Sequence, residues 1–394
     1  MDAVTPSAAV GYRVAAHGLA HRSPSAELPN ATGAIGVQDT PPGTAGQALH
    51  ARLANLAPED VDSAVMERKT LVTIWAMRGA PHVVPFAETA VFTEGLLPDD
   101  DASCLHFING ASGHLDRFSL SASEAVALTL DELPKALGGK QLTKDELGVA
   151  LAERVGKRLP SSARKGFTEP DGLGKNTYGE SLVRYALYVV ALHGVLCIVP
   201  RTKGASLFAL TEDWLGEPLP AMPSEAARAE IVRRYLRCHG PSDKTAFATW
   251  AGVSPSFAAA SWELIAGELT AVDYAGRTAW LLAEDLPALA APPSAEGVRL
   301  LPPYDPLLAT RDRAAFVSGT ARQREIWRIQ GNPGVVLGEG EIVGTWRPRK
   351  QGKNITITVS AMRTLTAATR DAITAEASAL APFRGAAKAT VVFA

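Results

Sequence analysis

The sequence predicts an α+β protein with three tandem winged helix-turn-helix units followed by a small C-terminal β-domain. Two observations lead to this fold class. A group of amphipathic helices followed by a strand pair around a glycine turn recurs along residues 10–98, 99–220 and 221–290. Residues 296–394 then alternate short β-rich runs with turns and contain one helical run.

The length and composition are those of a multidomain protein with an ordinary water-soluble composition. A chain of 394 residues is too long for one core, so we expect about two to four domains. Hydrophobic residues make up 46% of the chain and charged residues 20%, and the mean hydropathy is +0.04. The formal net charge of −2 gives no general attraction to nucleic acid, so an anion-binding surface must be a local group of Lys and Arg.

Cysteine usage and hydropathy favour a reducing cytoplasm. Cys104, Cys197 and Cys238 show no C-x-x-C spacing, and their odd number argues against a disulfide framework. No apolar run approaches the roughly 20 residues of a membrane span. The N-terminus lacks a basic region followed by an apolar one, so neither a leader nor a membrane partner is expected.

The first two units share one order of helices and strands. In the first we expect helices at Tyr12–Leu19 and Thr44–Asn55, a strand at Leu71–Met77, a turn at Arg78-Gly79 and a return strand at His82–Val84. In the second we expect a helix at Ser123–Leu137, a helix after the capping box Thr143–Glu146, a helix at Ser181–His193, a strand at Leu196–Val199 and a turn at Lys203-Gly204.

The third unit has the clearest pattern. Helices are expected at Glu225–Leu236, at Thr245–Ala251, and from the N-cap pair Ser254-Pro255 to Leu269. A hairpin of Thr270–Tyr274 and Thr278–Leu282 follows, which completes a winged helix-turn-helix, a fold that can place a helix in a DNA major groove. The alternatives are a generic α+β module, or a winged helix with a structural or protein-binding role.

The C-terminal part follows a linker at Ala288–Ser294. Strands are expected at Gly334–Leu337, Glu341–Arg347, Asn354–Val359 and Ala389–Phe393, with a helix at Ala367–Leu380. This pattern predicts a small antiparallel β-domain that carries one helix.

Three polar residues, Gln38, Asp39 and Thr40, stand directly before a proline-stiffened helix start. Pro41 and Pro42 lack backbone donors and have a fixed φ, and a helical run with an apolar face of alanines and leucines begins after Gly43. This arrangement points to a polar site at the beginning of a helix.

The run Gly36-Val-Gln-Asp-Thr-Pro-Pro and the Ala-Arg-Leu end of the helix resemble the pattern Gly-[Leu/Val]-Gln-x-Gln-x-Pro of the AlkZ-type winged-helix DNA glycosylases. Leu300-Leu-Pro-Pro-Tyr-Asp-Pro-Leu-Leu308 resembles a second motif of that family. The resemblance implies removal of alkylated bases and unhooking of interstrand crosslinks, in a C-shaped protein with three winged helices closed by a β-barrel. Gln38 falls on the first catalytic Gln of the family. Thr40 departs from it, because the family has Gln or Asp there.

The chemistry implied by this resemblance suits the three polar residues. A purine alkylated at N7 or N3 is cationic and leaves readily, so the protein must hold a water molecule near the anomeric carbon and stabilise positive charge on the sugar. The Gln38 amide can both donate to and accept from water. Asp39 could act as a base or supply negative charge, whereas Thr40 can bind water but is a poor base. The alternative is that Asp39 or Thr40 caps the helix behind Pro41.

Cationic residues near the predicted turns are candidate DNA contacts. One cluster, on a predicted hairpin, consists of Arg347, Arg349, Lys350 and Lys353, for which a solvated turn is the alternative. Single candidates at the three earlier turns are Arg78, His82, Lys203 and Arg277, and for His82 a packing role is the alternative.

Two functions of different class follow. The first is a monofunctional DNA glycosylase acting on N-alkylated or bulky purine adducts in double-stranded DNA. The second is a non-catalytic winged-helix DNA-binding or regulatory protein, which the departure at Thr40 favours. We expect no cofactor and no metal, because the eight histidines are scattered and no phosphate-binding or zinc-binding motif is present. A monomer is expected, because three joined winged helices need no two-fold partner.

Overall fold

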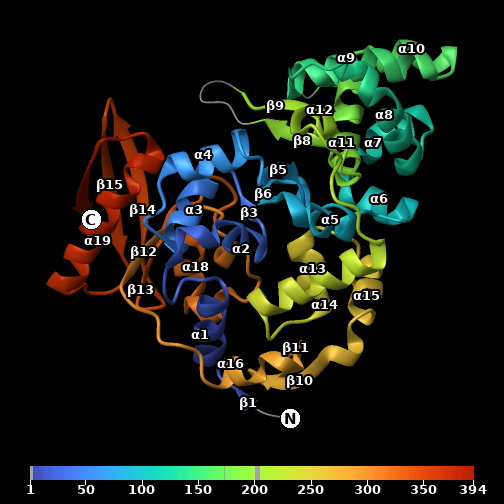
Figure 1. Cartoon of the computed structure of the whole chain (residues 1–394). Helices are drawn as coiled ribbons and strands as arrows, with labels where there is room; N and C mark the ends of the chain where they lie inside the picture. Colours follow the sequence, from blue (N-terminus) through green and yellow to red (C-terminus); the bar gives the residue numbers. More distant parts are fainter. Residues whose placement is uncertain (1–2, 173, 200–204) are drawn as a thin grey trace. The chain divides into compact units, whose positions relative to one another are not determined.

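The computed structural model describes residues 3–172, 174–199 and 205–394, and the chain divides into two compact units (Figure 1). The first unit comprises the described residues up to Ala64, Val232–Ala246 and Ile265–Ala394. The second comprises Val65–Ile231 and Phe247–Leu264. Both units combine helices with sheets, so the predicted α+β class is confirmed. Lys203 lies outside the described residues.

The N-terminal part of the first unit is built around two helices, α1 (Pro6–Ala16) and α3 (Thr44–Arg52). Val14 of α1 and Ala51 of α3 are fully buried and pack in one core with Leu301, Leu307 and Val335 from the C-terminal part. The remaining elements here are β1 (Ala3–Val4), β2 (Ser23–Pro24), α2 (Leu28–Gly33), β3 (Val37–Gln38), β4 (Leu53–Ala54) and α4 (Pro58–Met66). The apolar side of α3 therefore anchors the polar segment that precedes it.

The C-terminal part is a five-stranded sheet in the order β12-β13-β14-β15-β16, with α19 (Ala367–Leu380) on one face. The strands are β12 (Val298–Leu301), β13 (Gly334–Gly338), β14 (Glu341–Gln351), β15 (Asn354–Ala361) and β16 (Lys388–Phe393). The helix has the predicted bounds, but the prediction of a wholly antiparallel domain was wrong, because β15 and β16 run parallel. A helix that joins two neighbouring strands returns the chain to the same end of the sheet and makes them parallel.

The helices and strands expected for the third winged helix-turn-helix occur in the predicted order. They are α13 (Ser224–His239), α14 (Lys244–Ala251), α15 (Pro255–Glu263), β10 (Leu269–Tyr274) and β11 (Arg277–Leu282). The third helix ends at Glu263 rather than at Leu269. β10 and β11 pair antiparallel, and Ser242 exchanges two backbone hydrogen bonds of 2.8 Å with Trp280 of β11. Of these elements, α15 belongs to the second compact unit, and β10 and β11 belong to the first. Short helices α16 (Leu286–Ala290), α17 (Arg313–Phe316) and α18 (Thr320–Ile326) complete the first compact unit.

The second unit packs helices against an antiparallel sheet that contains, in order, β6 (Pro81–Pro85), β5 (Leu71–Trp75), β8 (Leu196–Val199), β9 (Leu207–Leu210) and β7 (Leu142–Thr143). Its core joins α8 (Ala122–Leu137), α9 (Lys144–Arg158) and α11 (Tyr178–Leu192). The predicted capping box of Thr143 and Glu146 is confirmed at the start of α9. The other helices are α5 (Thr89–Phe92), α6 (Asp101–Phe107), α7 (Ser112–Phe118), α10 (Ser161–Phe167) and α12 (Thr211–Leu215).

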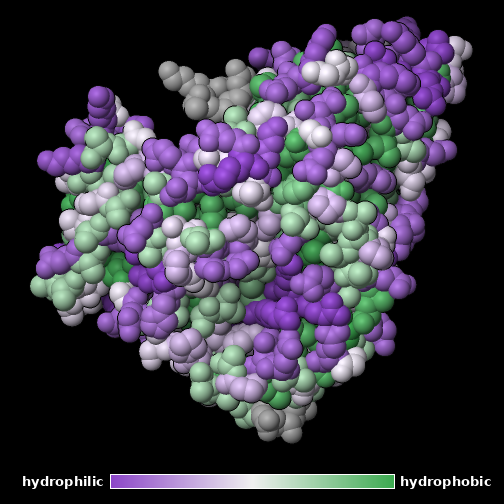
Figure 2. All heavy atoms as spheres, in the orientation of Figure 1, coloured by the Kyte–Doolittle hydropathy of each residue, from purple (hydrophilic) through white to green (hydrophobic). Residues whose placement is uncertain are grey.

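Apolar residues at the surface are interspersed with polar ones on the face drawn in Figure 2. Large exposed apolar side chains, such as Ile329 and Val392, come from separate elements, and single ones are normal on protein surfaces. The three cysteines are unpaired and buried. Burial raises the pKa of Cys104 to about 11 and that of Cys197 and Cys238 to about 12.

Candidate functional site

The segment between β3 and α3 is held by the carboxylate of Asp39. Its Oδ1 accepts hydrogen bonds from the amide nitrogens of Gly43 at 2.7 Å and Ala45 at 3.0 Å. The first amides of a helix have no partner within the helix, and the helix dipole favours an anion there. Gly43 makes the turn possible, because its φ is +89°. Asp39 therefore has the geometry of the helix cap, one of the two roles expected for it.

The pKa of Asp39 is raised above its ordinary value of 3.8. Burial of the carboxyl is the largest cause, and the hydrogen bonds from the amides of Ala45, Gly43 and Thr44 partly oppose it. A raised pKa makes the carboxylate a better proton acceptor near neutral pH. The capping geometry and a role in proton transfer can therefore coexist in this side chain.

Thr40 does not act as the cap. Its hydroxyl oxygen is buried and has no hydrogen-bond partner among the described residues. The nearby hydroxyl of Thr44 instead donates to the carbonyl oxygen of Pro41 at 2.8 Å. A buried hydroxyl without a partner costs about 1–3 kcal/mol, so the Thr40 oxygen is suited to a water molecule or ligand group.

Gln38 ends β3 and is half-buried. Behind it, one turn into α3, Gln47 is buried and donates from Nε2 to the carbonyl oxygen of Gly43 at 3.1 Å. Oε1 of Gln47 accepts from Nη1 of Arg384 at 2.8 Å. Gln47 and Arg384 thus stabilise the turn between β3 and α3 through side-chain hydrogen bonds. Neither residue was predicted from the sequence, although the position of Gln47 in an alanine-rich helix was a signal.

The opposite end of α3 is fixed by the second motif. Arg52 donates from Nη1 and Nη2 to the two carboxylate oxygens of Asp305, and the motif Asp itself is fully buried. Asp305 also accepts from the amide of Leu307 at 3.0 Å, which begins a short 3₁₀ turn. A further, part-buried contact joins Arg22 to Glu376 of α19 at 2.5 Å. Both sequence motifs therefore act on the same helix, one at each end.

Of the two candidate DNA contacts on the first hairpin, Arg78 is exposed and has a left-handed φ of +57°. Its guanidinium donates to the carbonyl oxygen of Trp250. His82 is buried and donates from Nδ1 to the carbonyl oxygen of Ala80 at 2.9 Å. Burial, with a smaller effect of Arg78, lowers the pKa of His82 to about 3. The imidazole is neutral at physiological pH and offers no positive charge to a phosphate, which favours the packing role.

Arg277 is exposed at the start of β11 and lies at a cavity of about 270 Å³ within the first unit. Tyr274 and Arg13 also line this cavity. The buried guanidinium of Arg13 is occupied by the carbonyl oxygens of Gly240 and Pro241 and by the carboxylate of Asp312. Arg13 therefore forms a wall of the cavity, whereas Arg277 reaches solvent.

The basic hairpin, defined here as Arg347, Arg349, Lys350 and Lys353, spans the end of β14 and the turn to β15. Its cations do not share one face. Arg347 and Arg349 pair with Thr358 and Thr356 on the outer face, whereas Lys350 lies opposite Ile355 on the α19 face and donates to the carbonyl oxygen of Arg384 at 3.0 Å.

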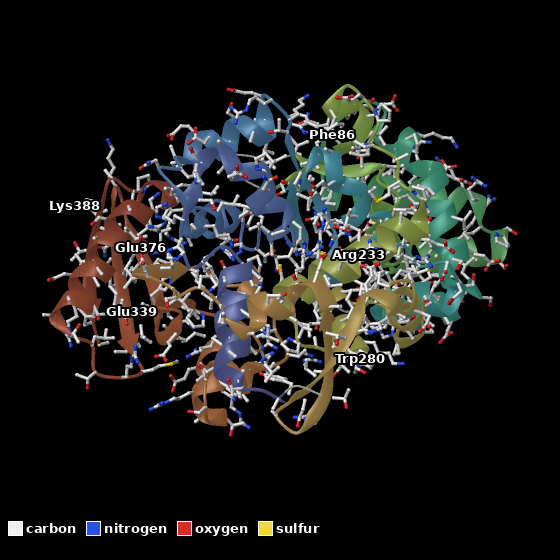
Figure 3. The ribbon with its side chains drawn as sticks, turned by 60° about the horizontal axis from the view of Figure 1, so that its bottom comes forward. Phe86, Arg233, Trp280, Glu339, Glu376 and Lys388 are labelled. Carbon is white, nitrogen blue, oxygen red and sulfur yellow. The ribbon has the colours of Figure 1, made fainter. Side chains whose placement is uncertain are left out.

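The outer face of the basic hairpin gains a further cation that the sequence analysis did not include. Lys388 begins β16 and pairs with Asn354, which shares a face with Thr356 (Figure 3). Arg347 donates from Nη2 to the carbonyl oxygen of Gly331 at 2.8 Å. Arg349 and Lys388 are exposed beside it, so this face carries three cations.

Among the described residues, no group of His, Cys, Asp and Glu is arranged to hold a metal ion. No helix in the described part of the chain is long and apolar enough to cross a membrane.

Known proteins resemble this chain in sequence and in structure. The sequence model of the AlkZ-like DNA glycosylases matches residues 31–383. The interstrand DNA cross-link repair glycosylase of Streptomyces sahachiroi is 28% identical over 307 residues, which cover 76% of each protein. The Streptomyces sahachiroi DNA glycosylase AlkZ has a similar fold, with a TM-score of 0.76 over 100% of both chains at 23% identity. The family match includes both ends of the site, Gln38 to Thr40 and Asp305.

Proposed function

The chain belongs to the AlkZ-like DNA glycosylase family, and from that premise we propose that it removes N-alkylated or bulky purines, crosslinked ones included, from double-stranded DNA. The reaction is hydrolysis of the N-glycosidic bond by a monofunctional, cofactor-independent monomer that leaves an abasic site. The observation that carries the proposal is the position of the half-buried Gln38 at the end of β3, directly before the capped start of α3.

The role proposed for Gln38 is to hold the attacking water. Its amide carries donors and an acceptor, so it can orient a water molecule toward the anomeric carbon while the cationic base departs. Gln38 sits at the end of a strand, and Gln47 and Arg384 support the turn behind it. A water held by such a fixed group needs little reorganisation as the glycosidic bond breaks.

Asp39 is proposed to act electrostatically or as the base. Its raised pKa makes it a better proton acceptor than an exposed aspartate. Its negative charge would also stabilise positive charge that develops on the sugar. Thr40 takes the position of the second motif residue, and its unpartnered hydroxyl supports a role in binding the same water.

DNA contacts are proposed for the outer face of the basic hairpin and for Arg78 and Arg277. Arg347, Arg349 and Lys388 share an exposed face, on which phosphates could displace counterions. We further propose that the helices and hairpins form winged helices and that the C-terminal sheet belongs to a barrel-like domain. The order α13, Ser242 bridge, α14, α15 and hairpin supports this for the third unit.

A non-catalytic DNA-binding protein is the second candidate. The observation in its favour is the hydroxyl of Thr40, where the family pattern has a Gln or Asp side chain. A hydroxyl cannot accept a proton from water as a carboxylate can. On this alternative, binding to DNA is retained and hydrolysis is lost.

The deciding experiment is incubation of the purified protein with duplex DNA that contains 7-methylguanine, followed by alkaline cleavage at abasic sites. A glycosylase yields alkali-labile sites in proportion to enzyme and time. Duplexes with bulky purine adducts and with an interstrand crosslink test the wider substrate range. Binding without cleavage on all three substrates would favour the second candidate.

A further inference from the structure

A second cavity, of about 290 Å³, lies in the second unit between the start of α9 and one face of α11. Four of its lining side chains come from α11 at spacings of three or four residues, which places them on one side of the helix. The lining residues are Lys144, Asn176, Ser181, Arg184, Tyr185 and Tyr188. None of them belongs to the glycosylase site described above.

The two tyrosine rings of this cavity are held in place by glycines from other segments. A methyl group added at Gly79 would lie 2.8 Å from the ring of Tyr188, and one at Gly110 would lie 2.8 Å from the ring of Tyr185. Both rings therefore occupy space that any side chain at these positions would fill. Aromatic rings fixed in this way form a rigid wall rather than a mobile surface.

The ammonium group of Lys144 is also fixed. It donates to the hydroxyl of Tyr188 at 2.8 Å and lies 4.7 Å from the centre of that ring and 5.1 Å from the ring of Trp75. Attraction between a cation and ring faces orients the charge without neutralising it. Lys144 thus presents its ammonium group in a fixed orientation at the cavity that it lines.

Arg184 provides the second charge. Its side chain is 17% exposed, and its Nη1 lies 3.1 Å from the carboxylate of Asp145, which is 84% exposed and therefore screened by water. Its Nε is buried and has no hydrogen-bond partner among the described residues. A methyl group at Gly148 would lie 2.5 Å from that Nε, so the glycine leaves the space in which the guanidinium lies. The guanidinium therefore retains a hydrogen-bond donor that can bind an anion.

We propose that this cavity binds one nucleotide, with its base stacked on Tyr185 and its phosphate held by Lys144 and Arg184. Aromatic rings combined with cations are the means by which proteins hold unpaired nucleotides. The volume is at the lower end of the range of ligand pockets and suits a ligand of one nucleotide.

The polar lining of the cavity agrees with this ligand. The amide of Asn176 can pair with the edge of a base. Ser181 donates its hydroxyl to Asp171 at 2.6 Å and retains acceptor capacity toward a base or sugar. Two acidic side chains contact lining residues of the cavity: Asp145 pairs with Arg184, and Asp171 accepts from Ser181.

The nucleotide can come from an unstacked position in a DNA strand or from solution, and only the first source rests on the function proposed above. Two fluorescent probes distinguish them. One is 2-aminopurine deoxyribonucleoside 5′-monophosphate, and the other is single-stranded oligothymidylate with one internal 2-aminopurine. Stacking on a tyrosine changes the 2-aminopurine fluorescence, so titration of the full-length protein gives the affinity.

The variants Arg184→Gln and Tyr185→Leu should each weaken binding by about tenfold, the first through loss of a phosphate contact and the second through loss of stacking. Gly148→Ala should also weaken it, because the new methyl group displaces the Arg184 side chain without removing its charge. The Tm of this variant is measured alongside, because the better helix propensity of Ala and the crowding against Arg184 act in opposite directions. Matched controls are Tyr178→Leu on the same helix and Arg117→Gln, whose partner is the half-exposed Glu169.

If both probes bind and the variants show this pattern, the cavity binds a nucleotide from either source. If only the oligonucleotide binds, the ligand is a nucleotide within a DNA strand. The proposal is overturned when the wild type binds neither probe, or when cavity and control variants lose affinity alike. Excision of 7-methylguanine is measured separately on the same proteins. A wild type that binds a probe but excises no 7-methylguanine counts against the glycosylase proposal, whereas a wild type that excises the base but binds neither probe contradicts the nucleotide cavity.

Discussion

Asp305 and Arg52 form a bidentate pair, with 2.8 Å between Nη1 and Oδ2 and 2.8 Å between Nη2 and Oδ1. Both side chains are buried, so the pair lies away from water. It fastens the last turn of α3 to the C-terminal part of the first unit, while Asp39 holds the first turn. Removing one partner leaves an uncompensated buried charge.

Asp305→Ala should lower the free energy of unfolding by about 3–5 kcal/mol, because it leaves the Arg52 guanidinium buried and unpaired. Urea denaturation followed by circular dichroism measures this change. The double variant Arg52→Met/Asp305→Leu removes both charges and should recover most of the loss. A loss below about 1 kcal/mol for Asp305→Ala would contradict the buried pair.

Gln38→Ala should reduce the single-turnover rate of 7-methylguanine excision by about 100-fold or more while DNA affinity changes little. The reason is that the amide acts on the water in the transition state rather than on the bound duplex. Rapid-quench kinetics and fluorescence anisotropy provide the two measurements. Gln141→Ala, at an exposed position before β7, is the control. Equal losses of rate and affinity would reassign Gln38 to DNA binding.

Asp39→Asn should separate capping from proton transfer. Asn is also a good helix cap, so stability at neutral pH should be retained, whereas Asp39→Ala should lose about 1 kcal/mol. A large fall in the excision rate of the folded Asn variant identifies Asp39 as the base. A rate equal to that of the wild type would leave Asp39 with the capping role alone.

The stability difference between the wild type and Asp39→Asn should depend on pH. Because the folded-state pKa is raised, the wild-type carboxyl contributes stability below pH 3.8 that is lost as the pH rises through the folded-state value. Asn does not titrate, so its stability relative to the wild type should improve from pH 3.8 toward neutrality. Urea denaturation at several pH values measures the difference, and a constant difference would rule out a raised pKa.

Thr40→Val should leave the free energy of unfolding unchanged or raise it by about 1 kcal/mol, because it removes a buried hydroxyl without a hydrogen-bond partner. If that hydroxyl holds the catalytic water, the same variant should lower the excision rate. Thr40→Gln restores the pattern of the family and should preserve or raise excision. If neither the wild type nor Thr40→Gln excises small or bulky adducts, the glycosylase proposal is wrong.

Arg347→Ala/Arg349→Ala should weaken duplex binding and reduce the slope of log affinity against log salt by about 2, because each lost phosphate contact changes it by roughly 0.9. Lys350→Ala is the matched control, since its ammonium faces α19 and Arg384. Anisotropy titrations from low to moderate salt provide the slopes. Equal slopes for the wild type and the double variant would show that this face does not meet DNA.

Local patterns predicted the elements well and their long-range partners poorly. The capping box at Thr143 and the bounds of α19 follow from neighbouring residues, so the sequence was sufficient for them. The parallel pairing of β16 depends on the path of the chain after α19, which no local pattern records. The third helix of the last unit was predicted too long, because Ala266–Glu268 forms a 3₁₀ turn after it.

The same division applies to the site. Gln38, Asp39 and Thr40 lie in one short motif and were found together. Arg52 pairs with a residue 253 positions away, and Gln47 with one 337 positions away, so their roles emerge from the folded chain. The opposite faces taken by Arg349 and Lys350 follow from strand alternation, which became clear once the bounds of β14 were known.

The buried thiols give the protein a chemical tolerance suited to its proposed work. Electrophiles that alkylate purines also attack cysteine, and they react with the thiolate. With a pKa of about 11 for Cys104 and higher values for the other two, on the order of one thiol in ten thousand or fewer is ionised at pH 7. The protein is thereby a poor target for the alkylating reagents that would create the substrates proposed for it.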